Sequence, residues 1–128
     1  MTEKKSYYID IKVQTTYAKE QSDPSNQYYV FIYQIRIHNL GTVGVKLISR
    51  HWTITDAQGT VQEIRGIGGV IGEQPYLKPG EIFEYASGAV LNTPVGSMAG
   101  DYELLADDGN TFTAEIPAFS LAIPNIIH

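Results

Sequence analysis

Cysteine is absent from the 128 residues, and this absence removes several functions at the outset. Disulfide bridges, thiolate metal sites and a cysteine nucleophile are all excluded. A chain without cysteine also fits a reducing compartment, so we expect the protein to lie in the cytoplasm.

Long apolar runs are missing as well. No stretch approaches the roughly 20 consecutive apolar residues that a membrane-spanning helix needs, so we expect no membrane insertion. The first residues, MTEKKSYYIDIK, contain lysines but lack the apolar segment that follows the lysines of an export signal.

Positive charge is scarce. Nine lysine and arginine residues stand against fourteen aspartate and glutamate residues, which gives a formal net charge of −5. Duplex binding depends on lysine and arginine side chains that displace counterions from phosphates. We therefore expect no extended nucleic-acid partner.

Helical periodicity does not persist over ten residues anywhere, whereas apolar and polar positions alternate repeatedly. About seven short strands separated by turns are typical of an antiparallel sandwich. We predict an all-β protein, an immunoglobulin/fibronectin type III-like antiparallel β-sandwich in which residues 1–128 form a single domain. The predicted strands cover residues 7–15, 28–39, 45–56, 61–65, 82–87, 101–107 and 111–123.

In two of the predicted strands the alternation of inward and outward residues is irregular. Arg50 shares the inward register with Trp52, so we expect either a position at the strand's rim or a bulge. Pro117 divides the last strand, and the inward register changes between Ile116 and Phe119. A bulge or an edge position at Pro117 explains both the proline and the changed register.

Glycines cluster after the strand at residues 61–65, where they suggest a dinucleotide-binding fingerprint. That fingerprint requires a helix to begin immediately after it, because the helix N-terminus holds the pyrophosphate. Here Gly72 is followed by Glu73-Gln74-Pro75 and another predicted strand. Three residues rather than two also separate Gly68 from Gly72. We therefore reject a Rossmann-type site.

Two interpretations of the glycine loop stay open. Successive N–H groups in a glycine-rich turn can bind an anion, and arginine and histidine residues near in sequence would add positive charge. Alternatively, the glycines only allow the chain to turn tightly and cross between sheets. The candidate ligand-binding residues are Arg50, His51, Arg65, Gly66, Gly68, Gly69, Gly72 and Gln74.

Catalytic and metal-binding patterns are missing. The serines lie outside any G-x-S-x-G motif, and the three histidines lack the spacing of a metal site. We therefore predict a non-enzyme with no cofactor and no metal ligands. Exposed aromatic side chains would suit a protein-binding surface, and Tyr28, Tyr76 and Tyr85 are the candidates.

Short sequence blocks lie along the whole chain. They are LISRHW at 47–52, ITD at 54–56, GEQP at 72–75, KPGE at 78–81, YASG at 85–88, LNTP at 91–94, GSMAGDY at 96–102 and IPAF at 116–119. With these blocks in this order, the chain resembles the bacterial ApaG family. The resemblance implies one ApaG domain with a fibronectin type III-like fold, and it implies an association with cobalt resistance and magnesium efflux. Related domains in eukaryotic F-box and polymerase-interacting proteins imply a protein-binding role.

The family loop is written G-x-G-x-x-G and is associated with pyrophosphate or nucleotide binding. Gly66, Gly68 and Gly72 match its glycines with one additional residue between the last two. We expect a small soluble module that binds an unidentified protein partner and affects metal homeostasis indirectly. The alternative is a phosphate-bearing ligand (pyrophosphate, nucleotide or dinucleotide) at the glycine loop. An edge strand around Pro117 would also allow a homodimer.

Overall fold

The computed structural model describes residues 5–68 and 72–124, and these residues form β-strands, turns and two short 3-10 helices. Over these residues the all-β prediction is confirmed, with eight strands rather than about seven. The 3-10 helices η1 (Lys19–Gln21) and η2 (Pro24–Asn26) lie in the polar segment between the first two strands. The strands are β1 (Ile9–Tyr17), β2 (Tyr29–Asn39), β3 (Val45–Asp56), β4 (Val61–Ile67), β5 (Tyr76–Leu77), β6 (Ile82–Leu91), β7 (Val95–Ala106) and β8 (Thr111–Ala122).

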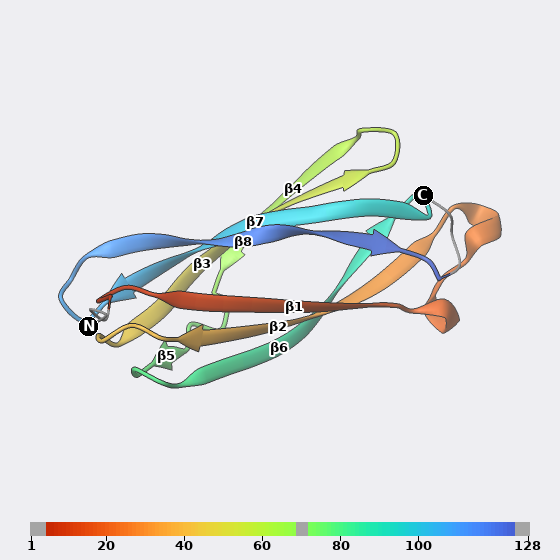
Figure 1. The fold of residues 1–128 in the computed structure, drawn as a ribbon. Helices are drawn as coiled ribbons and strands as arrows, with labels where there is room; N and C mark the ends of the chain where they lie inside the picture. The colour runs from red at the N-terminus through yellow and green to blue at the C-terminus, as the bar shows by residue number, and fades with distance from the viewer. Residues whose placement is uncertain (1–4, 69–71, 125–128) are drawn as a thin grey trace.

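The strands form two sheets that lie face to face (Figure 1). One sheet has the order β1-β2-β6, and the other has the order β4-β3-β7-β8 with β5 paired to β3. All the strand pairings described are antiparallel. The predicted antiparallel sandwich is therefore confirmed, while its fibronectin type III-like variant stays a prediction.

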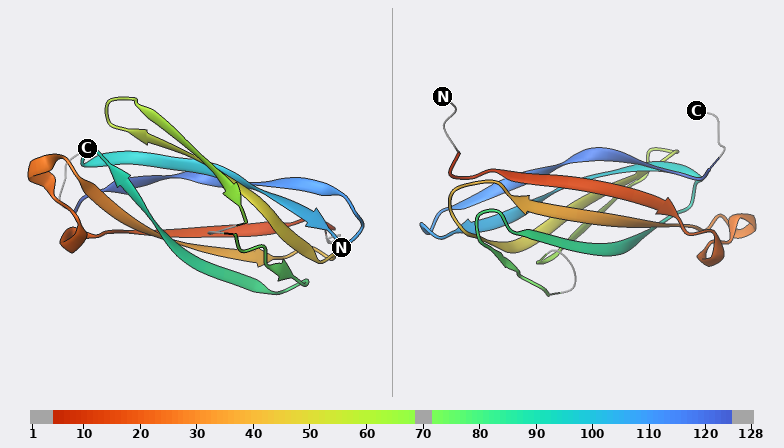
Figure 2. Two further views of the ribbon diagram at one scale, coloured as in Figure 1. Left: turned by 180° about the vertical axis from the view of Figure 1, so that it is seen from behind. Right: turned by 60° about the horizontal axis from the view of Figure 1, so that its bottom comes forward.

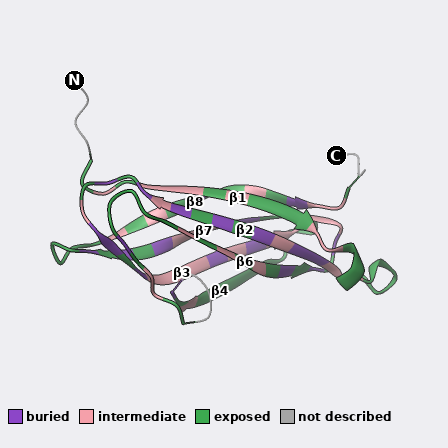
Figure 3. Ribbon diagram, turned by 90° about the horizontal axis from the view of Figure 1, so that it is seen from below, coloured by how far each residue is buried: buried purple, intermediate pink, exposed green. Residues whose placement is uncertain are grey.

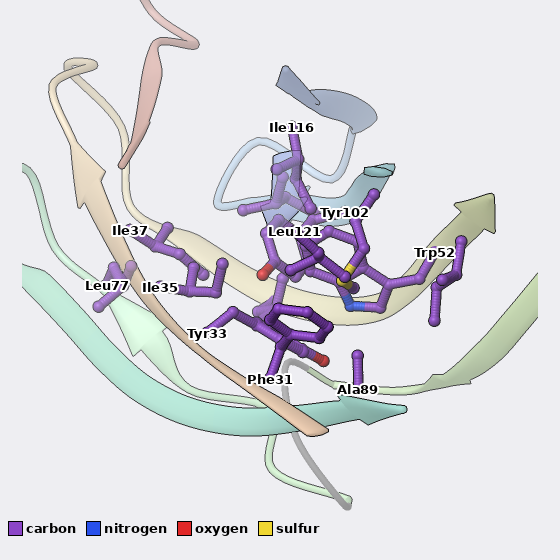
Figure 4. Close-up of a cluster of buried hydrophobic side chains, with 14 of the residues drawn as sticks. Phe31, Tyr33, Ile35, Ile37, Trp52, Leu77, Ala89, Tyr102, Ile116 and Leu121 are labelled. Atoms are coloured by element: carbon purple, nitrogen blue, oxygen red, sulfur yellow. The ribbon is translucent and has the colours of Figure 1, made fainter. Parts of the chain in front are cut away.

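Aromatic side chains from both sheets meet in the core around Trp52. The Trp52 ring lies edge-on to Tyr33, Tyr102 and Phe119, at centroid distances of 5.3, 6.4 and 5.8 Å. Figure 4 shows Tyr33 approaching Trp52 and Tyr102 from the facing sheet. Edge-on packing of this kind places the positive ring edge against a negative ring face. The single tryptophan thus holds the two sheets together.

The alternation of inward residues changes at two bulges. In β3 the pairing with β7 shifts between Leu47 and Ser49, which leaves Ile48 as an extra residue. Of the two explanations expected for Arg50, a rim position or a bulge, the pairing shows a bulge, which lies two residues earlier at Ile48. The pairing of β7 with β8 shifts opposite Pro117, where the inward series passes from Ile116 to Phe119. The expectation for Pro117 is confirmed.

Three strands are longer than the sequence predicted, and one of them, β4, continues beyond residue 65 to Ile67. The strand expected to end at residue 87 continues to Leu91, and the one expected to begin at residue 101 begins at Val95. The first half of β7, VGSMAG, contains small residues that hide the apolar alternation. The connection between β6 and β7 is therefore only the turn at residues 92–94.

Candidate functional site

Arg50 connects β3 to the beginning of the glycine loop. Its Nη1 atom donates a hydrogen bond of 2.8 Å to the carbonyl oxygen of Ile67 and a longer one of 3.4 Å to that of Gly68. Gly66 pairs with Arg50 across the two strands, and a Cβ atom there would come within 2.7 Å of the guanidinium. The missing side chain at Gly66 therefore makes room for Arg50.

The carbonyl of Ile48, the extra residue of the β3 bulge, binds both ends of the loop. It accepts a hydrogen bond of 2.8 Å from the Gly68 N–H and one of 3.0 Å from Nε2 of Gln74. Gly68 has a φ of +73°, and a Cβ atom there would lie 1.7 Å from the carbonyl oxygen of Glu73. Only glycine fits this position, because a side chain would meet both backbone strain and a clash.

Two tyrosine hydroxyls lie between the sheets near Arg50. Tyr102 pairs with Arg50 across β3 and β7, and its hydroxyl forms a hydrogen bond with the hydroxyl of Tyr85 from the facing sheet. Burial raises the pKa of Tyr85 to about 12 and raises the pKa of Tyr102 as well, while the nearby charge of Arg50 lowers both. Arg50 therefore contributes positive charge beside a neutral, buried hydroxyl pair.

His51 and Arg65 lie on the opposite face of the sheet from Arg50. Successive residues of a strand point to opposite faces, and His51 pairs with Arg65 across β3 and β4. The His51 ring lies between two carboxylates, with Nε2 3.3 Å from Glu63 Oε1 and Nδ1 3.8 Å from Asp101 Oδ2. Acidic neighbours make this side of the sheet unfavourable for an anion.

The structure thus divides the predicted ligand-binding residues into two groups. Arg50, Gly66, Gly68 and Gln74 lie together at the ends of the loop, whereas His51 and Arg65 lie on the other face. Gly72 is exposed with a φ of +73°, and Gly69 lies outside the described residues. Arg50, His51 and Arg65 do not converge on one point. The role of these residues in ligand binding stays a prediction.

Residues 5–68 and 72–124 lack several features that would indicate other functions. No helix begins at Gly72, which agrees with the rejection of a Rossmann-type site. Within these ranges no group of three or more histidine and acidic side chains is placed to hold a metal ion. Nor do the described residues include a helix long and apolar enough to cross a membrane.

A hollow of about 740 Å³ lies on the outer face of the β1-β2-β6 sheet. Polar and charged side chains line much of it, including Lys12, Gln14 and Arg36. Arg36 is paired with Glu84, with 3.5 Å between Nε and Oε1. Of the residues predicted from the sequence to bind a ligand, none of those that the structure describes lines this hollow.

Strand β4 forms a surface that sequence reasoning missed. It is the outermost strand of its sheet, and the β3–β4 hairpin projects beyond the other strands (Figures 1 and 2). The exposed fractions of its aliphatic side chains are 56% for Val61, 36% for Ile64 and 63% for Ile67. Figure 3 shows β4 mostly exposed, in contrast to the buried centre of β2. The spacing of three between these residues was the available signal, because a strand places them on both faces.

Known proteins resemble this chain over its whole length. A family model described as the ApaG domain matches residues 19–106. Proteins named ApaG from Thiobacillus denitrificans and Nitrosospira multiformis are 60% and 56% identical, each over 100% of both chains. A solved structure of a Bordetella pertussis protein named ApaA has a TM-score of 0.93 at 48% identity, covering 97% of this chain and 100% of that one.

Proposed function

The chain belongs to the ApaG family, and we propose that it acts as a small protein-binding module, not an enzyme, whose partner adds a strand to the free edge of β4. The observation that carries this proposal is the exposure of β4. An unpaired edge presents backbone N–H and C=O groups that another strand can satisfy. Val61 and Ile67 add apolar contacts beside those groups. The proposed recognition mode is therefore β-strand addition.

The opposite edge of the same sheet, that of β8, is less suitable for a partner. Pro117 lacks an N–H group and lies exposed at the bulge, so it interrupts the pattern that an added strand would need. Prolines and bulges are common devices that protect sheet edges from pairing. Strand β4 has neither over residues 61–67.

A cytoplasmic location and an indirect link to cobalt resistance and magnesium efflux follow as parts of this proposal. A module that binds a protein would influence metal homeostasis through its partner. Its own described residues contain no cluster of metal-ligand type.

Capture from a bacterial cytosolic extract, with quantification by mass spectrometry, tests the proposal. Arg65→Pro removes an N–H group from the outer edge of β4, and Ile67→Asp replaces an exposed aliphatic side chain with a charge. We expect both variants to lose the proteins that the wild-type chain captures. Lys12→Glu, in the outer face of the other sheet, is the control and should capture them normally. Equal capture by the wild type and both β4 variants would refute strand addition at this edge.

The alternative function is binding of pyrophosphate, a nucleotide or a dinucleotide at the glycine loop. The positive φ angles of Gly68 and Gly72, at the two ends of the loop, favour it, because such conformations can direct N–H groups toward an anion. Against it, Arg50 already donates to two carbonyl groups. Calorimetric titration with pyrophosphate and with ATP tests this alternative. Heat of binding that is present in the wild type and absent in Arg50→Met would support a phosphate-bearing ligand at the loop. No heat at millimolar ligand would refute it.

A further inference from the structure

We propose that the strand added to β4 is the β4 strand of a second copy of this chain, paired antiparallel about a twofold axis at Ile64. This inference rests on the proposed function, because it names the occupant of the same edge. Closed twofold dimers are the commonest symmetric assemblies, and they require a surface that is complementary to itself. The sequence of β4, VQEIRGI, has this property.

The hydrogen bonds at the two ends of the β3–β4 ladder show which backbone groups face the free edge. Asp56 N–H donates to the Thr60 carbonyl at 3.0 Å, and Gly68 N–H donates to the Ile48 carbonyl at 2.8 Å. The pairing between these ends is regular, so hydrogen-bonded pairs recur at every second residue. The even-numbered residues of β4 therefore bond to β3. The odd-numbered residues 61, 63, 65 and 67 direct their N–H and C=O groups outward.

The charges then select one register for a twofold antiparallel pair. Hydrogen bonds form between the copies only if odd-numbered residues of one lie opposite odd-numbered residues of the other. The twofold axis therefore passes through a residue of β4 and not between two residues. An axis at Glu63 or at Arg65 places identical charges opposite each other, which is unfavourable. An axis at residue 62 places Glu63 opposite Val61, and an axis at residue 66 places Arg65 opposite Ile67, so neither register pairs opposite charges. An axis at Ile64 places Glu63 of each copy opposite Arg65 of the other.

The same register also matches the apolar residues. Val61 of each copy faces Ile67 of the other, so an apolar pair lies on each side of the two ion pairs. These four residues are on one face of the sheet, where they follow His51 and Thr53 of β3. On the other face Ile64 meets Ile64 of the second copy. The resulting sheet would run continuously through both chains.

The shape of the molecule leaves this edge accessible. In Figures 1 and 2 the β3–β4 hairpin extends away from the β1-β2-β6 sheet. A second copy can thus approach β4 from the side without displacing a described strand of the first. The exposed aliphatic side chains of β4 would become partly covered in the dimer.

Sedimentation velocity over a concentration series tests the dimer, using single charge reversals and the double reversal. Glu63→Arg places arginine opposite arginine, and Arg65→Glu places glutamate opposite glutamate. We expect each single variant to weaken the wild-type dimer by at least tenfold in Kd. The double variant Glu63→Arg/Arg65→Glu exchanges the charges and should restore it. An equimolar mixture of the two single variants should form a heterodimer, because opposite charges meet again. Lys12→Glu and Glu115→Arg are matched charge controls and should dimerise like the wild type.

A wild-type chain that stays monomeric to millimolar concentration overturns the dimer, as does failure of both the double variant and the mixture to restore association. Tryptophan emission checks that each variant is folded. If the chain is monomeric but Arg65→Pro still abolishes capture of another protein, the dimer is wrong and the proposed function stands. If Arg65→Pro affects neither association nor capture, both fail.

Discussion

The guanidinium of Arg50 donates a hydrogen bond of 2.8 Å to the carbonyl oxygen of Ile67, joining an inward side chain of β3 to the last residue of β4. The two residues are separated by 17 positions in the sequence, and the contact closes the hairpin at its open end. Arg50 is therefore placed to hold the end of β4 and the beginning of the glycine loop against β3.

Replacing Arg50 with methionine should loosen this end of the hairpin. Methionine keeps an apolar stem but cannot donate to the Ile67 and Gly68 carbonyls. We expect a loss of about 1–2 kcal/mol in the free energy of unfolding, as for other hydrogen bonds from charged donors. Amide exchange at Gly68, whose N–H binds Ile48, should become faster while exchange at Leu104 in β7 stays unchanged. Unchanged protection of Gly68 would show that Arg50 does not hold the loop.

Gly68→Ala should be far more harmful than Gly59→Ala. Both glycines have positive φ angles, +73° and +84°, so both substitutions introduce backbone strain of about 1 kcal/mol. A Cβ atom at Gly59 meets nothing within 4 Å, whereas one at Gly68 lies 1.7 Å from the Glu73 carbonyl oxygen. We therefore expect Gly68→Ala to cost at least about 2 kcal/mol more than the control in urea unfolding. Equal costs would mean that the clash is relieved by a small shift of residue 73.

Alkaline pH should destabilise the protein through Tyr85. Its pKa of about 12 lies above the ordinary tyrosine value of 10.0, because burial disfavours the ionised form. The stabilisation is fully present below pH 10 and is lost as the pH rises through 12, since the unfolded chain releases its proton first. Two pH units correspond to about 2–3 kcal/mol.

The measurement is urea unfolding from pH 9 to pH 12 for the wild type and for Tyr85→Phe. The wild type should lose about 2 kcal/mol more than the variant over this range, because phenylalanine has no proton to release. The chain has nine tyrosines, so the difference in tyrosinate absorbance between the wild type and Tyr85→Phe reports the ionised fraction of Tyr85. Parallel curves for the two proteins would contradict an elevated pKa at Tyr85.

The fluorescence of Trp52 should show that its side chain is buried. The side chain is 1% exposed, and within the described residues its Nε1 atom is buried without a hydrogen-bond partner. An indole in apolar surroundings emits at short wavelength, so we expect a blue-shifted spectrum that iodide does not quench. Unfolding should shift the emission to the red and restore quenching. Strong quenching of the native protein would mean that the core opens to solvent.

Much of the fold could be predicted because alternation survives wherever one face of a strand is buried. The alternation predicts β2 from four buried residues, Phe31, Tyr33, Ile35 and Ile37. The changed register around Pro117 predicts the bulge there. The short strand β5 was missed because two residues, Tyr76 and Leu77, are too few to show a period. The start of β7 was missed because its residues are small.

The candidate site was only partly predictable. Arg50, His51 and Arg65 were grouped because they are close in sequence, yet neighbouring residues of a strand point to opposite faces. That rule alone separates Arg50 from His51. The double role of the Ile48 carbonyl depends on a bulge and on Gln74, 26 residues further along, and no local pattern contains such a contact. The exposure of β4 depends on the extent of the facing sheet.

The two layers of the sandwich differ in width. Ile64 and Trp52 are paired on the same face of neighbouring strands, yet their exposed fractions are 36% and 1%. The narrower layer ends before it reaches the outermost strand of the wider one, so that strand overhangs. An overhang turns a position that would otherwise be interior into surface. A molecule that packs against the inner face of β4 would cover Ile64 and so extend the hydrophobic core of this domain.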